Sequence, residues 1–191
     1  MEWSRLCTLI EKCSHDIKIT IVQWTKPPIK WVKLNTDGSA ILGSKGAGGV
    51  LRSNTGNMIF AFSAPLGEGT NTQAKVEAAI FGLTWCVHLN YKNVILEVDS
   101  KLIVDYITNN TTTPWNVASQ LQQLQQLISH FTHFKCNHIL REANFVADSM
   151  AKHSHETTSP HVLFSIQQLP KLATVLIASL SQVTFLPLTT T

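Results

Sequence analysis

The order of the predicted secondary-structure elements constrains the fold of this chain more than any other feature of its sequence. Residues 31–37 alternate between apolar and polar side chains, residues 46–52 are glycine-led and apolar, and residues 58–64 are apolar again. A turn-forming run at 54–57 separates the last two segments. Short runs of this kind, bounded by turn residues, are typical of strands, so we expect an antiparallel meander of three strands.

A helix and a fourth strand follow the meander. Apolar residues recur at helical spacing from about residue 71 through Val87, and the β-rich run 94–98 comes next. A helical crossover between two strands of one sheet is right-handed, so we expect 94–98 to lie parallel to and beside 31–37. The remaining pattern predicts a helix that Ser100 can cap, a helix over 113–131, a strand over 134–140 and a helix over 143–152. This order is that of an α/β fold.

The composition along the chain indicates one domain between two extensions. With 191 residues, 44% of them hydrophobic, the chain can bury one sizeable core. We expect an N-terminal extension or linker over 1–29, a domain over 30–153, and an apolar C-terminal tail over 154–191. The apolar stretch 172–186 is shorter than the roughly 20 residues that span a bilayer. We therefore expect the tail to cover exposed core and not to enter a membrane.

Charge and cysteine content exclude several functional classes. The net charge of +3 permits a nucleic-acid partner without arguing for one, because no dense cluster of Lys and Arg appears. The four cysteines have neither the short paired spacing of a zinc site nor the density of a disulfide scaffold, so we expect free thiols. Charged residues interrupt the first dozen positions, which argues against a secretory signal. No organelle signal is recognised either, so we expect the nucleus or cytosol.

Three aspartates occupy positions where a ligand site is expected. Asp37 ends the first strand, Asp99 ends the fourth, and Asp148 lies on the last helix. Parallel neighbours bring their carboxyl ends together, and ligands bind at such strand ends in open α/β sheets. Carboxylates held close are most easily explained by Mg²⁺ or Mn²⁺. Taken singly, Asp37 could instead form a turn with Gly38, and Asp99 could cap the following helix.

Five ordered motifs resemble those of ribonuclease H, in the plant reverse-transcriptase-like branch. The resemblance covers about 31–152, and each motif alone is weak, whereas five in order form a strong signal. It implies a five-stranded mixed sheet flanked by helices, and an endonuclease that cuts the RNA strand of RNA-DNA hybrids with two Mg²⁺ ions between four acidic residues. The motifs are Thr36-Asp37-Gly38-Ser39, Gly46-Ala47-Gly48-Gly49-Val50-Leu51-Arg52, Ala74-Lys75-Val76-Glu77-Ala78 with Gly82-Leu83, Val98-Asp99-Ser100, and Arg141-Glu142-Ala143-Asn144 with Ala147-Asp148.

The resemblance places Asp37, Asp99 and Asp148 in three of the four metal-ligand positions. The fourth, a glutamate in the family, is Lys75 here. Glu77 is a poor substitute, because two residues along a helix rotate a side chain by about 200°. Glu97 shares a strand face with Asp99 but is set back by roughly 6.6 Å. Mg²⁺ or Mn²⁺ binding is therefore expected to be weak or absent.

Substrate contacts are also implied by the resemblance. It places Asn71 at the start of the first long helix, near the minor groove of a hybrid, although Asn71 could equally be the N-cap of that helix. It further implies contacts from Gly38, Ser39, Ser100 and Asn144. The histidine that many family members carry before the last helix is missing, and we expect His138 and His153 to be structural.

Two functions remain open from the sequence. The first is a metal-dependent ribonuclease acting on RNA-DNA hybrids, with its activity impaired by Lys75. The second is a catalytically silent module, derived from a retroelement, that binds nucleic acid or protein. The family resemblance favours the first, and the lysine favours the second.

Overall fold

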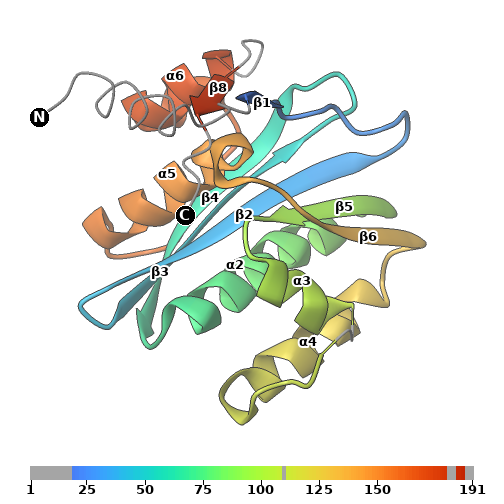
Figure 1. The fold of residues 1–191 in the computed structure, drawn as a ribbon, viewed down its shortest axis with the longest axis vertical. Helices are drawn as coiled ribbons and strands as arrows, with labels where there is room; N and C mark the ends of the chain where they lie inside the picture. Colours follow the sequence, from blue (N-terminus) through green and yellow to red (C-terminus); the bar gives the residue numbers. More distant parts are fainter. Residues whose placement is uncertain (1–18, 109–110, 180–183, 188–191) are drawn as a thin grey trace, which may run out of the picture.

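The computed structural model of the chain describes residues 19–108, 111–179 and 184–187. It has a mixed main sheet with helices on both faces and a separate antiparallel pair of short strands, β1 (Ile19–Val22) and β8 (Thr184–Pro187) (Figure 1). The strands of the main sheet are β2 (Val32–Ile41), β3 (Ser44–Arg52), β4 (Met58–Glu68), β5 (Asn93–Val98), β6 (His133–His138) and β7 (His161–Leu163). The α-helices are α2 (Asn71–His88), α3 (Lys101–Ile107), α4 (Ala118–Ile128), α5 (Phe145–His153) and α6 (Lys171–Ser179).

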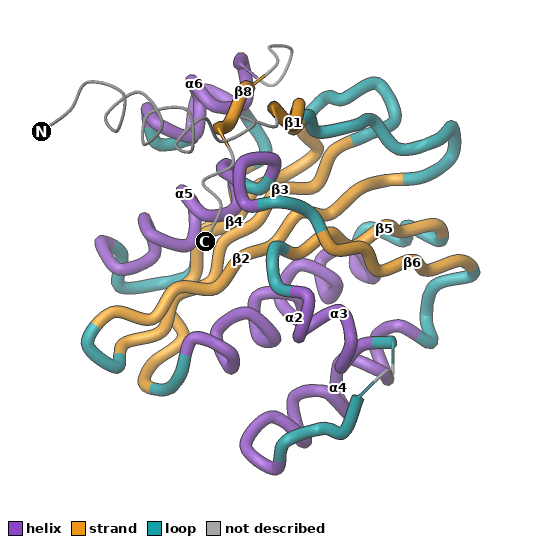
Figure 2. Tube along the Cα trace, in the orientation of Figure 1, coloured by secondary structure: helices purple, strands orange, loops and turns teal. Residues whose placement is uncertain are grey.

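The main sheet has the strand order β6-β5-β2-β3-β4-β7 (Figure 2). Strands β2, β3 and β4 are antiparallel neighbours, whereas β5 lies parallel to β2 and β6 lies parallel to β5. The predicted meander and the predicted pairing of the first and fourth strands are therefore confirmed. The crossover through α2 makes β2 and β5 end at the same edge of the sheet, which is the edge that carries the aspartates.

The main sheet has six strands, and the predicted five-stranded sheet is corrected in this respect. The sixth strand, β7, comes from the segment that the sequence analysis assigned to the tail, and it pairs antiparallel with β4. A strand of three residues is too short to show an alternating pattern, which is why the sequence did not reveal it. The predicted helix over 113–131 is also shorter: a 3-10 turn, Trp115–Val117, leads into α4.

Helix α2 covers one face of the sheet and builds most of the core there. Its N-terminus is closed by a capping box between Thr70 and Gln73, which satisfies backbone groups that would otherwise lack partners. Glycine is required where α2 crosses the strands: a Cβ on Gly82 would lie 2.8 Å from the side chain of Leu34. The apolar residues of this face form one continuous cluster with α3 and α4.

Helix α5 covers the opposite face against β3. A Cβ on Gly48 would lie 2.0 Å from the backbone nitrogen of Ala151, so this strand must carry glycine for α5 to approach. A smaller apolar cluster lies beside this contact, and it includes Val50 and Met150 together with Leu169 and Ala173 from the tail. Strands β2 and β3 and helix α6 thus hold α5 in place. The described fold continues past His153, where the predicted domain ended.

Residues before β2 also belong to the packed structure. The side chain of Trp24 is buried, and its Nε1 donates to Oδ1 of Asn35 at 2.9 Å. The guanidinium of Arg52 lies 4.6 Å from the centre of the Trp24 ring. Burial lowers the pKa of Arg52 to about 10, although the charge of Glu97 opposes this shift. The sequence pattern predicts only an extension or linker here, because an isolated Trp carries no periodic signal.

Among the described residues, no helix has both the length and the apolar character needed to cross a bilayer. Cys86 is buried and Cys136 is half-buried, and both are free thiols. Cys7 and Cys13 lie outside the described residues.

We predict that the tail is part of the cooperative fold, and Leu169 tests this. Leu169 is 6% exposed in the cluster with Val50 and Met150. Leu169→Ala removes buried methyl groups, so we expect the free energy of unfolding to fall by roughly 2–4 kcal/mol in denaturant titration. The matched control is Leu172→Ala, because Leu172 is 61% exposed on the same segment and should change stability by less than about 0.5 kcal/mol. Equal, small effects would show that the tail folds separately.

Candidate functional site

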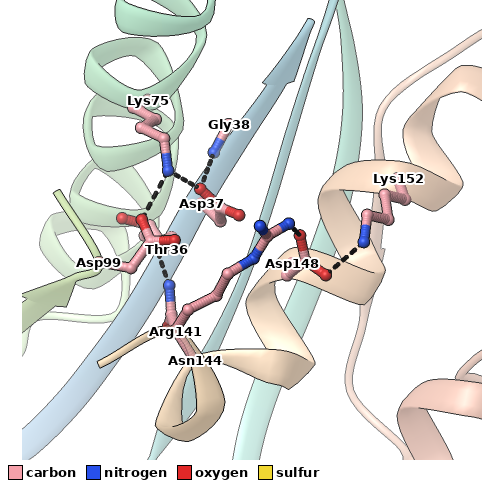
Figure 3. Close-up of polar contacts among 9 residues, drawn as sticks. All are labelled: Thr36, Asp37, Gly38, Lys75, Asp99, Arg141, Asn144, Asp148 and Lys152. Carbon is pink, nitrogen blue, oxygen red and sulfur yellow. Dashed lines mark hydrogen bonds and ion pairs between the residues drawn. The ribbon is translucent and has the colours of Figure 1, made fainter. Parts of the chain in front are cut away.

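Asp37 and Asp99 meet at the edge of the sheet where β2 and β5 end, and Lys75 lies between them (Figure 3). The Nζ of Lys75 is 2.5 Å from Oδ1 of Asp37 and 2.5 Å from Oδ1 of Asp99. These two oxygens are therefore no more than about 5 Å apart. The structure brings together three of the four residues that the sequence predicted to converge, with a cation joining the two carboxylates.

The local backbone explains why Lys75 reaches this position. The pairing of β5 with β2 ends at Val98, opposite Thr36, while β2 continues to Ile41. The edge of β2 beyond Thr36 is therefore open on that side. Helix α2 approaches this edge closely, because a Cβ on Gly38 would lie 2.2 Å from the backbone nitrogen of Lys75. Glycine at position 38 thus allows the first turns of α2 to place the lysine over the ends of both strands.

The electrostatics of this contact are set by burial and by the lysine. Burial raises the pKa of Asp37 to about 6, although the charge of Lys75 lowers it, and the charge of Asp99 raises it further. Burial alone would lower the pKa of Lys75, but attraction and hydrogen bonds from Asp37 and Asp99 outweigh that effect and raise it. Lys75 is therefore an ammonium at neutral pH. It supplies the positive charge that two carboxylates at this spacing require.

Asp148 lies on α5 across from this contact and has its own cations. Its Oδ1 accepts a hydrogen bond from Nη2 of Arg141 at 3.2 Å, and its Oδ2 accepts from Nζ of Lys152 at 2.6 Å. The pKa of Arg141 is raised, first by its hydrogen bond to Asp148, then by the charge of Asp148, and also by the charges of Asp37 and Asp99. The guanidinium of Arg141 thus lies within electrostatic reach of all three aspartates (Figure 3).

Site roles for Arg141 and Lys152 were not among the predictions from the sequence. The signal for Lys152 was present, because Asp148 and Lys152 are four residues apart on one helix and such pairs share a face. Arg141 belongs to the last of the five motifs, but it lies in a 3-10 turn before α5, and the direction of its side chain depends on tertiary structure. Both side chains are more than half exposed, at 63% for Arg141 and 55% for Lys152.

The donor set does not fit Mg²⁺ or Mn²⁺ in this conformation. The Lys75 ammonium already occupies Oδ1 of Asp37 and Oδ1 of Asp99, and a cation cannot be a metal ligand. Across the described ranges, no group of three or more His, Cys, Asp or Glu residues is arranged to hold a metal ion. Neither alternative carboxylate enters the site: Glu77 pairs with Lys45 at 2.7 Å, and Glu97 pairs with Lys33 at 2.7 Å.

The five predicted substrate contacts have different environments. Asn71 is exposed at the first residue of α2, and the N-cap is Thr70, so the capping alternative for Asn71 is wrong. Ser39 and Ser100 are half-buried near the aspartates, and Ser100 is the N-cap residue of α3 without a side-chain hydrogen bond to that helix. These three residues can reach a ligand, and contact with substrate stays a prediction for them.

Gly38 and Asn144 have structural explanations instead. Gly38 allows the approach of α2, and its backbone nitrogen donates to Oδ1 of Asp37 at 2.8 Å. Asn144 is 1% exposed, and its Nδ2 donates to the backbone oxygen of Thr36 at 3.0 Å, which ties the start of α5 to β2. The amide of Asn144 thus fixes α5 and positions Asp148, and contact of Asn144 with substrate stays a prediction. His153 pairs with Glu156, and His138 is exposed at the end of β6.

Comparison with known proteins agrees with the geometry. Residues 35–154 match the family described as reverse transcriptase-like, and this match covers more than half of the chain. The chain belongs to the reverse transcriptase-like family. A relative from Arabidopsis thaliana, named "Putative ribonuclease H protein", is 31% identical over 137 residues, which are 70% of this chain and 22% of the relative. This reverse transcriptase-like chain thus spans about a fifth of the length of that curated relative.

Solved structures place this reverse transcriptase-like chain in the ribonuclease H superfamily. RNase H1 of the archaeon Halobacterium salinarum has a TM-score of 0.64 and 23% identity, over 66% of this chain and 98% of that protein. LC11-RNase H1, solved in complex with an RNA/DNA hybrid, has a TM-score of 0.61 and 25% identity, over 65% of this chain and 96% of that protein. The ribonuclease H-like α/β fold that the sequence predicted is therefore confirmed.

We predict that the Asp37 carboxyl titrates near pH 6. In the unfolded chain the pKa of this carboxyl is 3.8, so the folded state binds the proton more tightly. The contribution of Asp37 to stability therefore falls as the pH rises from 3.8 to about 6. Carbon-detected NMR of the carboxyl group should give a midpoint of about 6. In Lys75→Met the midpoint should move upward, because the ammonium that lowers it has been removed. A midpoint that moves downward in the variant would contradict the contact.

We also predict that Lys75 stabilises the fold and that Mg²⁺ can partly replace it. Lys75→Met leaves two buried carboxylates without a cation, so the free energy of unfolding should fall by about 2 kcal/mol at pH 7.5. Millimolar Mg²⁺ should raise the melting temperature of this variant but not that of the unchanged chain. The control is Lys101→Met, whose side chain is 65% exposed and should cost less than about 0.5 kcal/mol. If Lys75→Met and Lys101→Met lowered the free energy of unfolding equally, a special role for Lys75 would be contradicted.

Proposed function

We propose that this chain binds RNA-DNA hybrids through the surface around Asp37, Asp99 and Asp148, and that it hydrolyses the RNA strand poorly or not at all. The observation that carries this proposal is the ammonium of Lys75 in contact with two of the three aspartates. Family membership supports the substrate class, and the cation supports the loss of hydrolysis. The proposal joins the two functions that the sequence left open.

Charge balance supports binding of a phosphate backbone without a metal ion. Three carboxylates alone would repel phosphates, but here each of them contacts a cation of the chain: Lys75 for two of them, and Arg141 and Lys152 for Asp148. The long side chains of Arg141 and Lys152 are exposed, so they can turn towards a phosphate. A neighbour of the same fold is described as a complex with an RNA/DNA hybrid, which agrees with this ligand class.

The same cations explain why hydrolysis would be weak. A bound metal ion would supply an activated water and stabilise the leaving oxygen. An ammonium can donate hydrogen bonds but cannot lower the pKa of a bound water in this way. Replacing the expected glutamate with lysine also changes the charge of the four-residue site from −4 to −2, which weakens its attraction for a divalent cation. The residues of this chain therefore favour holding a strand over cutting it.

Lys75→Glu is the decisive test. The variant removes a cation and adds a ligand, so it should strengthen Mg²⁺ binding and raise cleavage of a labelled hybrid by at least roughly tenfold in Mg²⁺ or Mn²⁺. Adding Asp37→Asn to this variant should abolish the gain. Binding of the unchanged chain to hybrid, measured by fluorescence anisotropy, should be the same in EDTA as in Mg²⁺ and should weaken steeply with salt.

The matched control is Lys101→Glu. It changes the charge by the same two units on an exposed residue two positions from Asp99, so a general charge effect would appear in it as well. It should leave cleavage unchanged. Efficient metal-dependent cleavage by the unchanged chain, at a rate close to that of Lys75→Glu, would overturn the assignment of Lys75. Absence of hybrid binding under all conditions would overturn the substrate class.

A further inference from the structure

A pocket of about 370 Å³ lies between α5 and the start of α6, next to the candidate site. Its volume falls within the range of about 300–1,000 Å³ that is typical of small-molecule sites. The pocket begins at Asp148 and Lys152, so it is continuous with the surface on which the proposed function depends. Its walls include Phe145, Asp148, Lys152, Glu156, Pro170 and Leu172.

The tail of the chain creates this pocket. Pro170 and Leu172 form one wall, and both lie outside the region 35–154 that matches the family. Their neighbours Leu169 and Ala173 are buried in the cluster against α5, which fixes the wall in place. Leu172 itself is 61% exposed, so it faces the pocket without being part of the core. The pocket is thus a feature of this chain and not of the matched domain alone.

The lining has the chemistry of a site for a flat polar ring. Phe145 and Leu172 are both exposed apolar side chains, and an aromatic face in such a place suits stacking of a base. Two carboxylates, Asp148 and Glu156, line the same space, and carboxylates accept hydrogen bonds. Both oxygens of Asp148 already accept from Arg141 and Lys152, so Glu156 is the available acceptor. Nδ1 of His153 lies 2.8 Å from Oε2 of Glu156 and orients that carboxylate. The ammonium of Lys152 also lines the pocket but is paired with Asp148, so the carboxylate of Glu156 disfavours a phosphate inside.

From these observations we propose that the pocket receives one unpaired nucleobase that carries an exocyclic amino group, from the strand bound at the candidate site. The inference rests on the proposed binding of nucleic acid. Adenine, cytosine and guanine present amino donors that a carboxylate can accept, whereas the corresponding edge of uracil presents carbonyl oxygens. Uracil would place those oxygens against Glu156, so it binds more weakly. The phosphates of the strand remain outside, beside Arg141 and Lys152.

The test is anisotropy binding with the full chain in EDTA, using a blunt hybrid and hybrids that carry one unpaired ribonucleotide at either end. We expect an overhanging adenosine or cytidine to improve affinity about fivefold over uridine at one of the two ends. Phe145→Ala and Leu172→Ala should remove the gain and leave blunt-hybrid binding unchanged. Val175→Ala is the matched control for Leu172, because Val175 is 64% exposed on the same helix and does not line the pocket.

Glu156→Gln supplies a specificity test that a change in folding cannot imitate. Glutamine has nearly the same shape but can also donate, so this variant should bind uridine and cytidine overhangs about equally. Overhang preferences that are the same in Glu156→Gln and in the unchanged chain would overturn the carboxylate contact. Equal binding of all hybrids, blunt or overhanging, would overturn the pocket while leaving the proposed function intact. A further outcome would be that free cytidine binds in the pocket by NMR while an overhang has no effect on hybrid affinity. That result would overturn the proposal that the base comes from the bound strand.

Discussion

The contact of the Lys75 ammonium with two buried carboxylates is the interaction on which the site depends. It requires three structural conditions at once: β2 must extend beyond the end of β5, Gly38 must admit α2, and the crossover must bring the two strand ends together. Given these conditions, the lysine neutralises a pair of charges that would otherwise repel each other. The ammonium therefore occupies the two carboxylate oxygens at this edge that a metal ion would otherwise contact.

A second set of buried charges lies on the same face of the sheet and shows how the chain tolerates them. Lys33, Asn35 and Glu97 are joined by an ion pair of 2.7 Å and a hydrogen bond of 3.0 Å. Trp24 packs against this set: its Nε1 donates to Asn35, and its ring lies against the guanidinium of Arg52. A buried charge is costly unless it is paired, and here each charged strand residue has a partner or an aromatic ring over it. The face that presents Asp37 is therefore polar along much of its length.

The segment after His153 adds a pocket beside the candidate site. In the matched region alone, α5 would present Phe145 and the neighbours of Asp148 to solvent. The packing of Leu169 and Ala173 brings the start of α6 alongside α5 and turns that surface into a pocket. A short edge strand, β7, holds the chain on the sheet before it reaches α6. The tail was expected only to cover exposed core. Its residues Pro170 and Leu172 instead form one wall of a pocket beside the site.

The periodicity of apolar residues determined the meander, α2 and the parallel pairing of β2 with β5, because long amphipathic elements and a crossover leave few alternatives. The resemblance of the ordered motifs to those of ribonuclease H predicted that Lys75 would stand with Asp37 and Asp99. The pairing of Asp148 with Arg141, the burial of Asn144 and the placement of Trp24 were decided only by tertiary structure, because single side chains in turns carry no periodic signal. The same holds for β7 and for the pocket beside α6. A three-residue strand and a half-exposed helix acquire their positions from the surface they pack against, and that surface exists only once the sheet has formed.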